Sequence, residues 1–287
     1  MMFRLNVPTK RGSVLNGVLF RQEEKKNIDT VMIAITGIHG NFYSNPFYYN
    51  IGDTLNSGGI DFIYAQTNDA FGQIRTKNIF TRAEEIIGSW NERFSYTDED
   101  IQAYLDFSER QGYKHIILAG HSLGANKVIY YLSRHHDTRI EKFVLLSPAN
   151  LTYMTSDVSE REKEYIRTEV EKGRGDRLLP FYFMGWVQCI VYTAYDWLSD
   201  TLNNVHVEQD GDFSQVSQIT HTGALLIGTL DRFTYGNPSG FLKNINDHMP
   251  TADQNKLIFI EGTGHTYQEK EQELADLLLE TVQEWEN

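Results

Sequence analysis

The clearest chemical signature in this chain is the pentapeptide Gly120–Gly124, which reads Gly-His-Ser-Leu-Gly and fits the pattern G-x-S-x-G. It directly follows the apolar run HIILA, typical of a buried strand, and it precedes a helical pattern. A sharp strand-to-helix turn of this kind holds its serine in a strained backbone conformation, exposed beside the positive end of the following helix. A glycine-rich turn with an incidental serine is the alternative, and the flanking patterns count against it. Ser122 is therefore predicted to be a nucleophile.

A serine hydroxyl needs a base, and the base needs a carboxylate that orients it. With this motif, the acid and then the histidine follow the serine along the chain. His265 lies just beyond a late strand-like run, in a tight loop that contains Gly262 and Gly264. Asp231 ends the preceding strand-like run, Ala224–Leu230. The sequence thus predicts His265 as the base and Asp231 as the acid.

Other residues of the same types are weaker candidates for these roles. His221 and His248 lie in polar helical or loop contexts, and His135-His136 at a helix end is typical of charge partners for the helix terminus. Besides Asp231, the other candidates for the acid are Asp247, Asp253 and Asp157.

Acyl transfer also requires hydrogen-bond donors for the oxyanion that develops on the substrate. The backbone N–H of Leu123, one residue after the nucleophile, is the first expected donor. The second should come from the loop 37–42, where the N–H of Asn41 is preferred, although His39-Gly40 could equally be a plain turn. Three further residues are expected to contact the substrate: Phe42, His121 and Trp186.

Eight short apolar runs are the predicted strands that position these groups. They are Phe3–Val7, Val14–Phe20, Thr30–Thr36, Ile60–Ala65, His115–Ala119, Lys142–Leu146, Ala224–Leu230 and Lys256–Ile260. Helical patterns over 97–110, 125–132 and 274–285 alternate with them. This alternation predicts an α/β fold with a mostly parallel sheet and helices on both of its faces.

The alternation fails between about residues 150 and 217. A mixed-charge run over 156–177 is followed by an aromatic-rich stretch over 178–198. We expect this segment to be a helical lid that covers one edge of the sheet. The predicted organisation is one core, residues 1–149 and 218–287, with a lid or cap insertion at 150–217.

The 287 residues carry a formal net charge of −13, which argues against nucleic acid and against polybasic attachment to a membrane. No run of 18 apolar residues predicts a membrane span, and no secretory signal is recognisable at the start of the sequence. Cys189 is the only cysteine, so paired-cysteine zinc sites are excluded. We expect a cytoplasmic protein that uses no metal or cofactor; its oligomeric state stays open.

Together these residues resemble the α/β-hydrolase superfamily. The similar parts are His39-Gly40 after the third strand, Gly120–Gly124, Gly228-x-x-Asp231 and Gly264-His265, although Phe42 stands where many members have a second glycine. The resemblance implies an eight-stranded sheet, a Ser–His–Asp triad and a lid inserted after the sixth strand. A looser likeness links the chain to a group of uncharacterised α/β hydrolases that includes fungal siderophore esterases.

The expected activity is that of an esterase-like serine hydrolase, which cleaves a carboxylic ester, or an amide or thioester, through an acyl-enzyme intermediate. The aromatic insertion suggests a small-molecule ester-like substrate with apolar or aromatic surface. One alternative is an acyltransferase or macrocyclising thioesterase-like enzyme with the same triad. Another is a non-catalytic binding protein built on a hydrolase scaffold.

Overall fold

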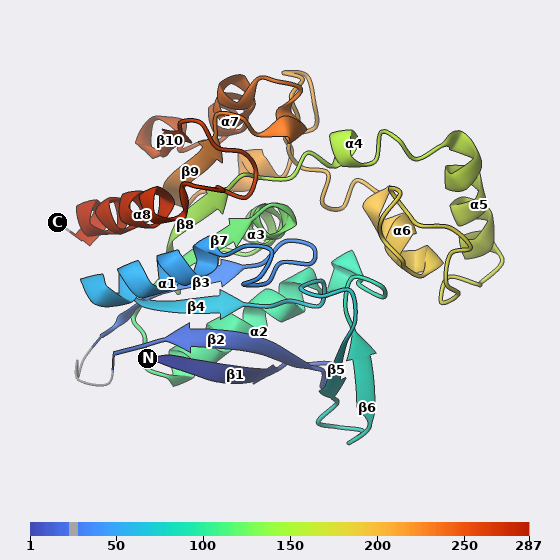
Figure 1. Ribbon diagram of the computed structural model, residues 1–287, viewed down its shortest axis with the longest axis horizontal. Coiled ribbons are helices and arrows are strands. Elements are labelled where there is room, and N and C mark those ends of the chain that lie inside the picture. Colours follow the sequence, from blue (N-terminus) through green and yellow to red (C-terminus); the bar gives the residue numbers. More distant parts are fainter. Residues whose placement is uncertain (23–27, 287) are drawn as a thin grey trace.

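An eight-stranded sheet runs through the protein, for which a computed structural model describes residues 1–22 and 28–286. The strand order is β1-β2-β4-β3-β7-β8-β9-β10, and only β2 runs against its neighbours (Figure 1). The strands are β1 (Met2–Pro8), β2 (Val14–Phe20), β3 (Thr30–Ile35), β4 (Asp61–Ala65), β7 (His115–His121), β8 (Ile140–Leu146), β9 (Thr222–Gly228) and β10 (Lys256–Ile260). The predicted α/β-hydrolase fold with a mostly parallel eight-stranded sheet is confirmed.

Helices cover both faces of this sheet. One face carries α2 (Thr97–Arg110), α3 (Leu123–Arg134) and α7 (Pro238–Asp247), and their apolar residues share a core with that side of the strands. The other face carries α1 (Phe47–Gly58) and α8 (Glu271–Glu286), which lie side by side over a second core. Every residue of β3 and β4 is buried, because an inner parallel strand is covered on both sides.

Three elements had no counterpart among the predicted ones, and α7 is one of them. The helix α1 follows the loop after β3, and a small antiparallel hairpin, β5 (Ile74–Lys77) with β6 (Glu84–Ile87), projects from the β1–β2 end of the sheet (Figure 1). Short 3-10 helices complete the described elements: η1 (Phe94–Tyr96), η2 (Val216–Gln218), η3 (Arg232–Thr234) and η4 (Ala252–Gln254).

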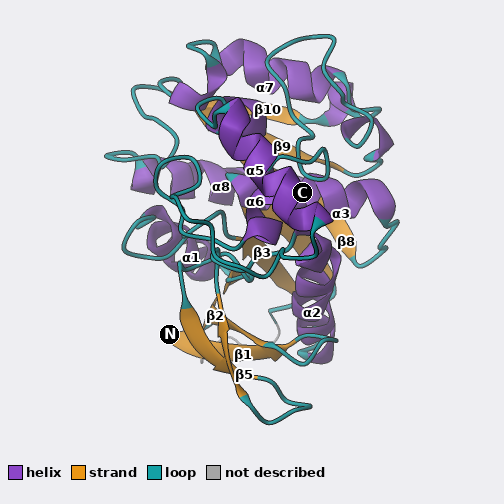
Figure 2. Ribbon diagram, turned by 90° about the vertical axis from the view of Figure 1, so that its right-hand side faces the viewer, coloured by secondary structure: helices purple, strands orange, loops and turns teal. Residues whose placement is uncertain are grey.

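The segment 150–217 holds α4 (Leu151–Met154), α5 (Glu160–Glu171) and α6 (Val191–Trp197). Its apolar side chains, among them Ile166, Phe183 and Trp197, form a small core that also includes Phe94 and Leu123 from outside the segment. Figure 2 shows α5 and α6 in front of the carboxyl ends of the parallel strands. The segment therefore faces the end of the sheet where Ser122 lies, rather than lying along an edge strand.

None of the helices in the described residues is both long and apolar enough to cross a membrane.

Candidate active site

Ser122 lies in the turn that connects β7 to α3, and its backbone is strained. Its φ of 55° and ψ of −128° belong to a region that residues with a side chain seldom adopt. The flanking glycines make this turn possible, because a Cβ on Gly124 would collide with the carbonyl of Ile35, and one on Gly120 with the carbonyl of Gly124. The strain and the close packing together fix where the Ser122 hydroxyl points.

Two hydrogen bonds connect Ser122 to the residues that the sequence predicted as its base and acid. The Oγ of Ser122 is 2.8 Å from Nε2 of His265. On the other side of the ring, Nδ1 of His265 is 2.8 Å from Oδ2 of Asp231. Ser122 follows the end of β7, Asp231 follows the end of β9 and His265 lies in the loop after β10. Three separate segments of the chain therefore meet here.

Asp231 is buried, and its environment favours the ionised carboxylate. Burial alone would raise the pKa of Asp231, but the neighbouring His265 and hydrogen bonds, among them one from the backbone N–H of Phe233, lower it below its usual value. Asp231 is also the N-cap of η3, so its Oδ1 is occupied at 3.0 Å by that N–H while Oδ2 faces His265. The carboxylate is thus held in one orientation, with a single oxygen free to accept from the imidazole.

His121 lines the cavity beside Ser122, but nearly all of its side chain is buried next to His265. It is only 3% exposed, and its Nε2–H donates to the carbonyl oxygen of His265 at 2.8 Å. Burial, and next the proximity of His265, lower the pKa of His121 to about 3, so the ring is neutral at physiological pH. The ring packs against Phe47, Tyr48 and Tyr267. His121 therefore holds the backbone of the loop that carries His265.

A cavity of about 440 Å³ opens above Ser122 and His265. Trp186, one of the predicted substrate contacts, lines it, and so do Ile38, Met154 and Arg232. Phe42 is not among the residues that line it. The Phe42 ring packs instead on Tyr64, with 4.4 Å between the ring centroids, and on Phe20.

The loop after β3 approaches Ser122 at Gly37 and not at Asn41. A Cβ on Gly37 would lie 2.9 Å from Cβ of Ser122 and 3.4 Å from the backbone nitrogen of Leu123. Ile38, the next residue, lines the cavity. Asn41 lies outside the cavity lining and turns back on its own loop, where its side-chain amide donates to the carbonyl of His39 at 2.8 Å. In the sequence, the first glycine after the strand marks this close approach.

Sequence reasoning missed a buried ionic cluster behind the site. Lys127 of α3 is 2% exposed, and its Nζ lies 3.1 Å from Asp69 and 2.5 Å from Glu92. Burial, and then the charge of Asp69, raise the pKa of Glu92 to about 8. The backbone carbonyl of Asp69 accepts the N–H of His39 at 2.9 Å. The cluster therefore links the helix that begins after Ser122 to the loop after β3.

The rival candidates lie elsewhere. Asp247 pairs with Lys243 at the surface, with 2.6 Å between carboxylate and ammonium. The ring of His248 stacks on Phe213 and its Nδ1 bonds the carbonyl oxygen of Asn244 at 2.8 Å. Across residues 1–22 and 28–286, no group of three or more His, Cys, Asp or Glu side chains is arranged to hold a metal ion.

Comparison with protein families gives a match over residues 14–222 to a model described as "Protein of unknown function (DUF1749)". The chain belongs to the DUF1749 family. None of the curated proteins compared with it matches significantly.

Solved structures that resemble this DUF1749 protein support the same fold. Est1E from Butyrivibrio proteoclasticus matches with a TM-score of 0.69 at 18% identity over 98% of each chain, and it has also been solved with ferulic acid bound. The α/β hydrolase GrgF from Penicillium sp. matches at 0.66 and 16% identity, over 97% of this chain and 96% of the other. A monoacylglycerol lipase from Paleococcus ferrophilus matches at 0.61 and 15% identity, over 93% and 97%. These structures confirm the predicted α/β-hydrolase fold.

Proposed function

We propose that this protein is a serine hydrolase that cleaves carboxylic esters of small molecules. The observation that carries the proposal is the chain of two 2.8 Å hydrogen bonds from Ser122 through His265 to Asp231, at the base of a cavity large enough for a small ligand. The similarity of the fold to esterases and a lipase agrees with it.

In the proposed reaction, the Oγ of Ser122 attacks the ester carbonyl while Nε2 of His265 takes the hydroxyl proton. Asp231 accepts a hydrogen bond from Nδ1–H of His265, which keeps Nε2 free to act as the base and stabilises the imidazolium that forms. His265 then returns the proton to the leaving alcohol, and an acyl group stays on Ser122. Water, deprotonated by the same histidine, attacks that acyl-enzyme and releases the carboxylic acid.

The oxyanion of each tetrahedral intermediate needs two donors close to Ser122. The backbone N–H of Leu123 is one proposed donor, at the first residue of α3. For the second we propose the N–H of Ile38 in place of Asn41, since the loop abuts Ser122 at Gly37. In the same scheme the segment 150–217 acts as the lid or cap, because it contributes Met154 and Trp186 to the cavity.

A panel of p-nitrophenyl esters of increasing acyl length tests the proposal. We expect measurable hydrolysis by the native protein and loss of it in Ser122→Ala. Ser133→Ala is the matched control, because Ser133 lies on α3, the helix that follows Ser122, and its hydroxyl donates to the carbonyl of Tyr130. Undiminished hydrolysis by Ser122→Ala would overturn the assignment. Adding alcohol or amine acceptors and analysing the products separates hydrolysis from acyl transfer.

A further inference from the structure

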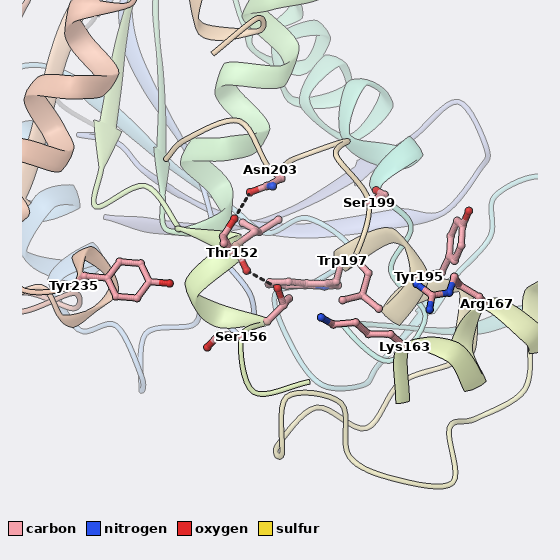
Figure 3. A pocket seen from close by; sticks show the side chains of 12 residues that line it. Thr152, Ser156, Lys163, Arg167, Tyr195, Trp197, Ser199, Asn203 and Tyr235 are labelled. Carbon is pink, nitrogen blue, oxygen red and sulfur yellow. Dashed lines mark hydrogen bonds between the residues drawn. The ribbon is translucent and has the colours of Figure 1, made fainter. Parts of the chain in front are cut away.

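A second cavity, of about 510 Å³, is lined by residues of α4, α5 and α6 in the segment 150–217 and by Tyr235. Its lining is rich in hydroxyl and amide groups, including Thr152, Ser156, Tyr235 and Asn203. Lys163 and Arg167 reach it from α5 (Figure 3). None of its 12 lining residues is acidic, in a chain whose net charge is −13.

The two cations stand four residues apart on the same side of α5. Like charges at this spacing repel each other and destabilise a helix slightly. Each has one glutamate partner on its own helix, Lys163 with Glu160 at 2.8 Å and Arg167 with Glu164 at 2.9 Å. These glutamates are largely exposed, and exposed pairs of this kind contribute little. Both cations therefore stay available to an anionic ligand that enters the cavity.

This second cavity adjoins the one above Ser122, and a single turn of helix separates them. In α4, Met154 lines the catalytic cavity whereas Thr152 lines the second. The ring of Tyr153, between them, packs on Phe233 and on Tyr235, with centroid distances of 5.6 and 4.8 Å. Phe233 in turn lies with its ring centroid 4.5 Å from that of His265. The two cavities therefore lie on either side of this one turn.

The catalytic cavity carries a positive charge of its own. Arg232 lines it, is exposed, and has no carboxylate within 4.0 Å in the described part of the chain. Its guanidinium lies over the Phe233 ring at 4.9 Å from the centroid. Apart from histidines, no other side chain that lines this cavity is ionisable. Cations thus occur on both sides of α4, with no lining acid to neutralise them.

We propose that the second cavity binds an anionic oxygen group of the substrate, so that the preferred ester carries a second, ionised group such as a carboxylate. Its ester lies at Ser122, and its anionic end lies between Lys163 and Arg167 with the hydroxyls of the cavity as further donors. The cations provide charge-assisted hydrogen bonds to that end. This inference rests on the proposed esterase function of Ser122.

The test compares monoesters of dicarboxylic acids of increasing length with their neutral methyl diesters. We expect the native protein to favour the charged member of a pair at one range of lengths. In the double variant Lys163→Gln/Arg167→Gln, this preference in kcat/KM should fall about tenfold or more, mainly through KM. Arg161→Gln is the matched control, because it removes a positive charge from the same helix but lies outside the cavity. An unchanged preference in the double variant would overturn the inference.

A binding measurement separates this inference from the proposed function. Calorimetry with Ser122→Ala and the same monoesters reports binding without turnover. Binding that depends on Lys163 and Arg167, with no ester cleaved by the native protein, would support the cavity and overturn the esterase function. Cleavage that depends on Ser122, with no preference for charge, would overturn the cavity inference alone. Adipate and inorganic phosphate are then compared as competitors of monoester binding. Stronger competition by adipate indicates a site for a carboxylate, and stronger competition by phosphate indicates a site for a phosphate.

Discussion

The substitution Asp231→Asn tests whether Asp231 orients His265 for catalysis or only forms a hydrogen bond with it. In the native site, Oδ1 of Asp231 accepts the N–H of Phe233 at 3.0 Å, and Oδ2 faces Nδ1 of His265 at 2.8 Å. The asparagine oxygen will keep the Phe233 N–H, so its NH₂ group will face His265. Nδ1 must then accept a hydrogen bond, and the proton moves to Nε2. In that tautomer His265 cannot take the proton of Ser122.

The expected loss follows from this change of tautomer. The corresponding change in a well-known serine protease lowers kcat about 10,000-fold, which corresponds to about 5 kcal/mol of activation free energy. We expect a loss of this order here in hydrolysis of p-nitrophenyl esters, with KM nearly unchanged, since Asp231 lies outside the cavity lining. Thermal unfolding must show that the variant is folded.

Asp247→Asn is the matched control for this experiment. Asp247 is the rival acid from the sequence, but it is half exposed and paired with Lys243. Its substitution should leave kcat within about twofold of the native value, because an exposed pair contributes little. A folded Asp231→Asn variant that keeps more than a tenth of native kcat would refute the reasoning, as would a large loss in the control.

Three further predictions concern the groups that support the site. Lys127→Met leaves two buried carboxylates without their cation and should lower the free energy of unfolding in urea by about 3–5 kcal/mol. Lys243→Met, at an exposed pair, should lower it by about 1 kcal/mol or less, and equal losses in the two variants would contradict a stabilising role for the buried cluster. Gly37→Ala should lower kcat about 100-fold, because its Cβ would push the loop away from the proposed oxyanion site, while Gly72→Ala, with its nearest atom at 3.7 Å, should leave kcat unchanged. Burial lowers the pKa of His121 in the folded protein from 6.5 to about 3, so between these pH values the imidazole is protonated in the unfolded chain but not in the folded protein. The free energy of unfolding should therefore fall by up to about 1.4 kcal/mol per pH unit as the pH drops from 6.5 towards 3. His121→Gln should show a flatter profile, and a profile as steep as the native one would show that His121 is not the cause.

The strands were predictable because of how an inner parallel strand is packed. Both faces of β3, β4 and β7 are covered, so these strands appear in the sequence as continuous apolar runs with clear ends. The positions of Ser122, Asp231 and His265 were equally predictable, because each residue lies shortly after one of these apolar runs. The sequence alone therefore predicts the sheet and three side chains that the structure brings within hydrogen-bonding distance.

The helix α1 and the hairpin β5–β6 lacked such a signal. α1 contains Gly52 and several polar residues of low helix propensity, and Gly52 is required because the Phe20 ring packs directly on it. The strands of the hairpin are short, and most of their residues are exposed, so no apolar run marks them. Both elements depend on contacts with distant segments, which local patterns do not record.

The buried charges show the same limit. The acidic residues of 97–110 are typical of a solvated helix face, yet Asp100 is buried and pairs with Arg11 at 2.7 Å. Lys127 lies on an otherwise apolar face of α3, and its partners come from loops far away in the chain. The loop after β3 shows the limit too: its motif was recognised, but which of its residues lies beside Ser122 depends on packing against the turn after β7.

The most direct test of the central claim is mass spectrometry of the protein quenched with acid during turnover of a p-nitrophenyl ester. We expect a covalent adduct whose mass equals that of the acyl group, on the peptide that contains Ser122, appearing with the burst of p-nitrophenol and absent from Ser122→Ala. An adduct on another residue, or steady hydrolysis that leaves no adduct on Ser122 even when deacylation is slowed, would contradict the proposed acyl-enzyme mechanism.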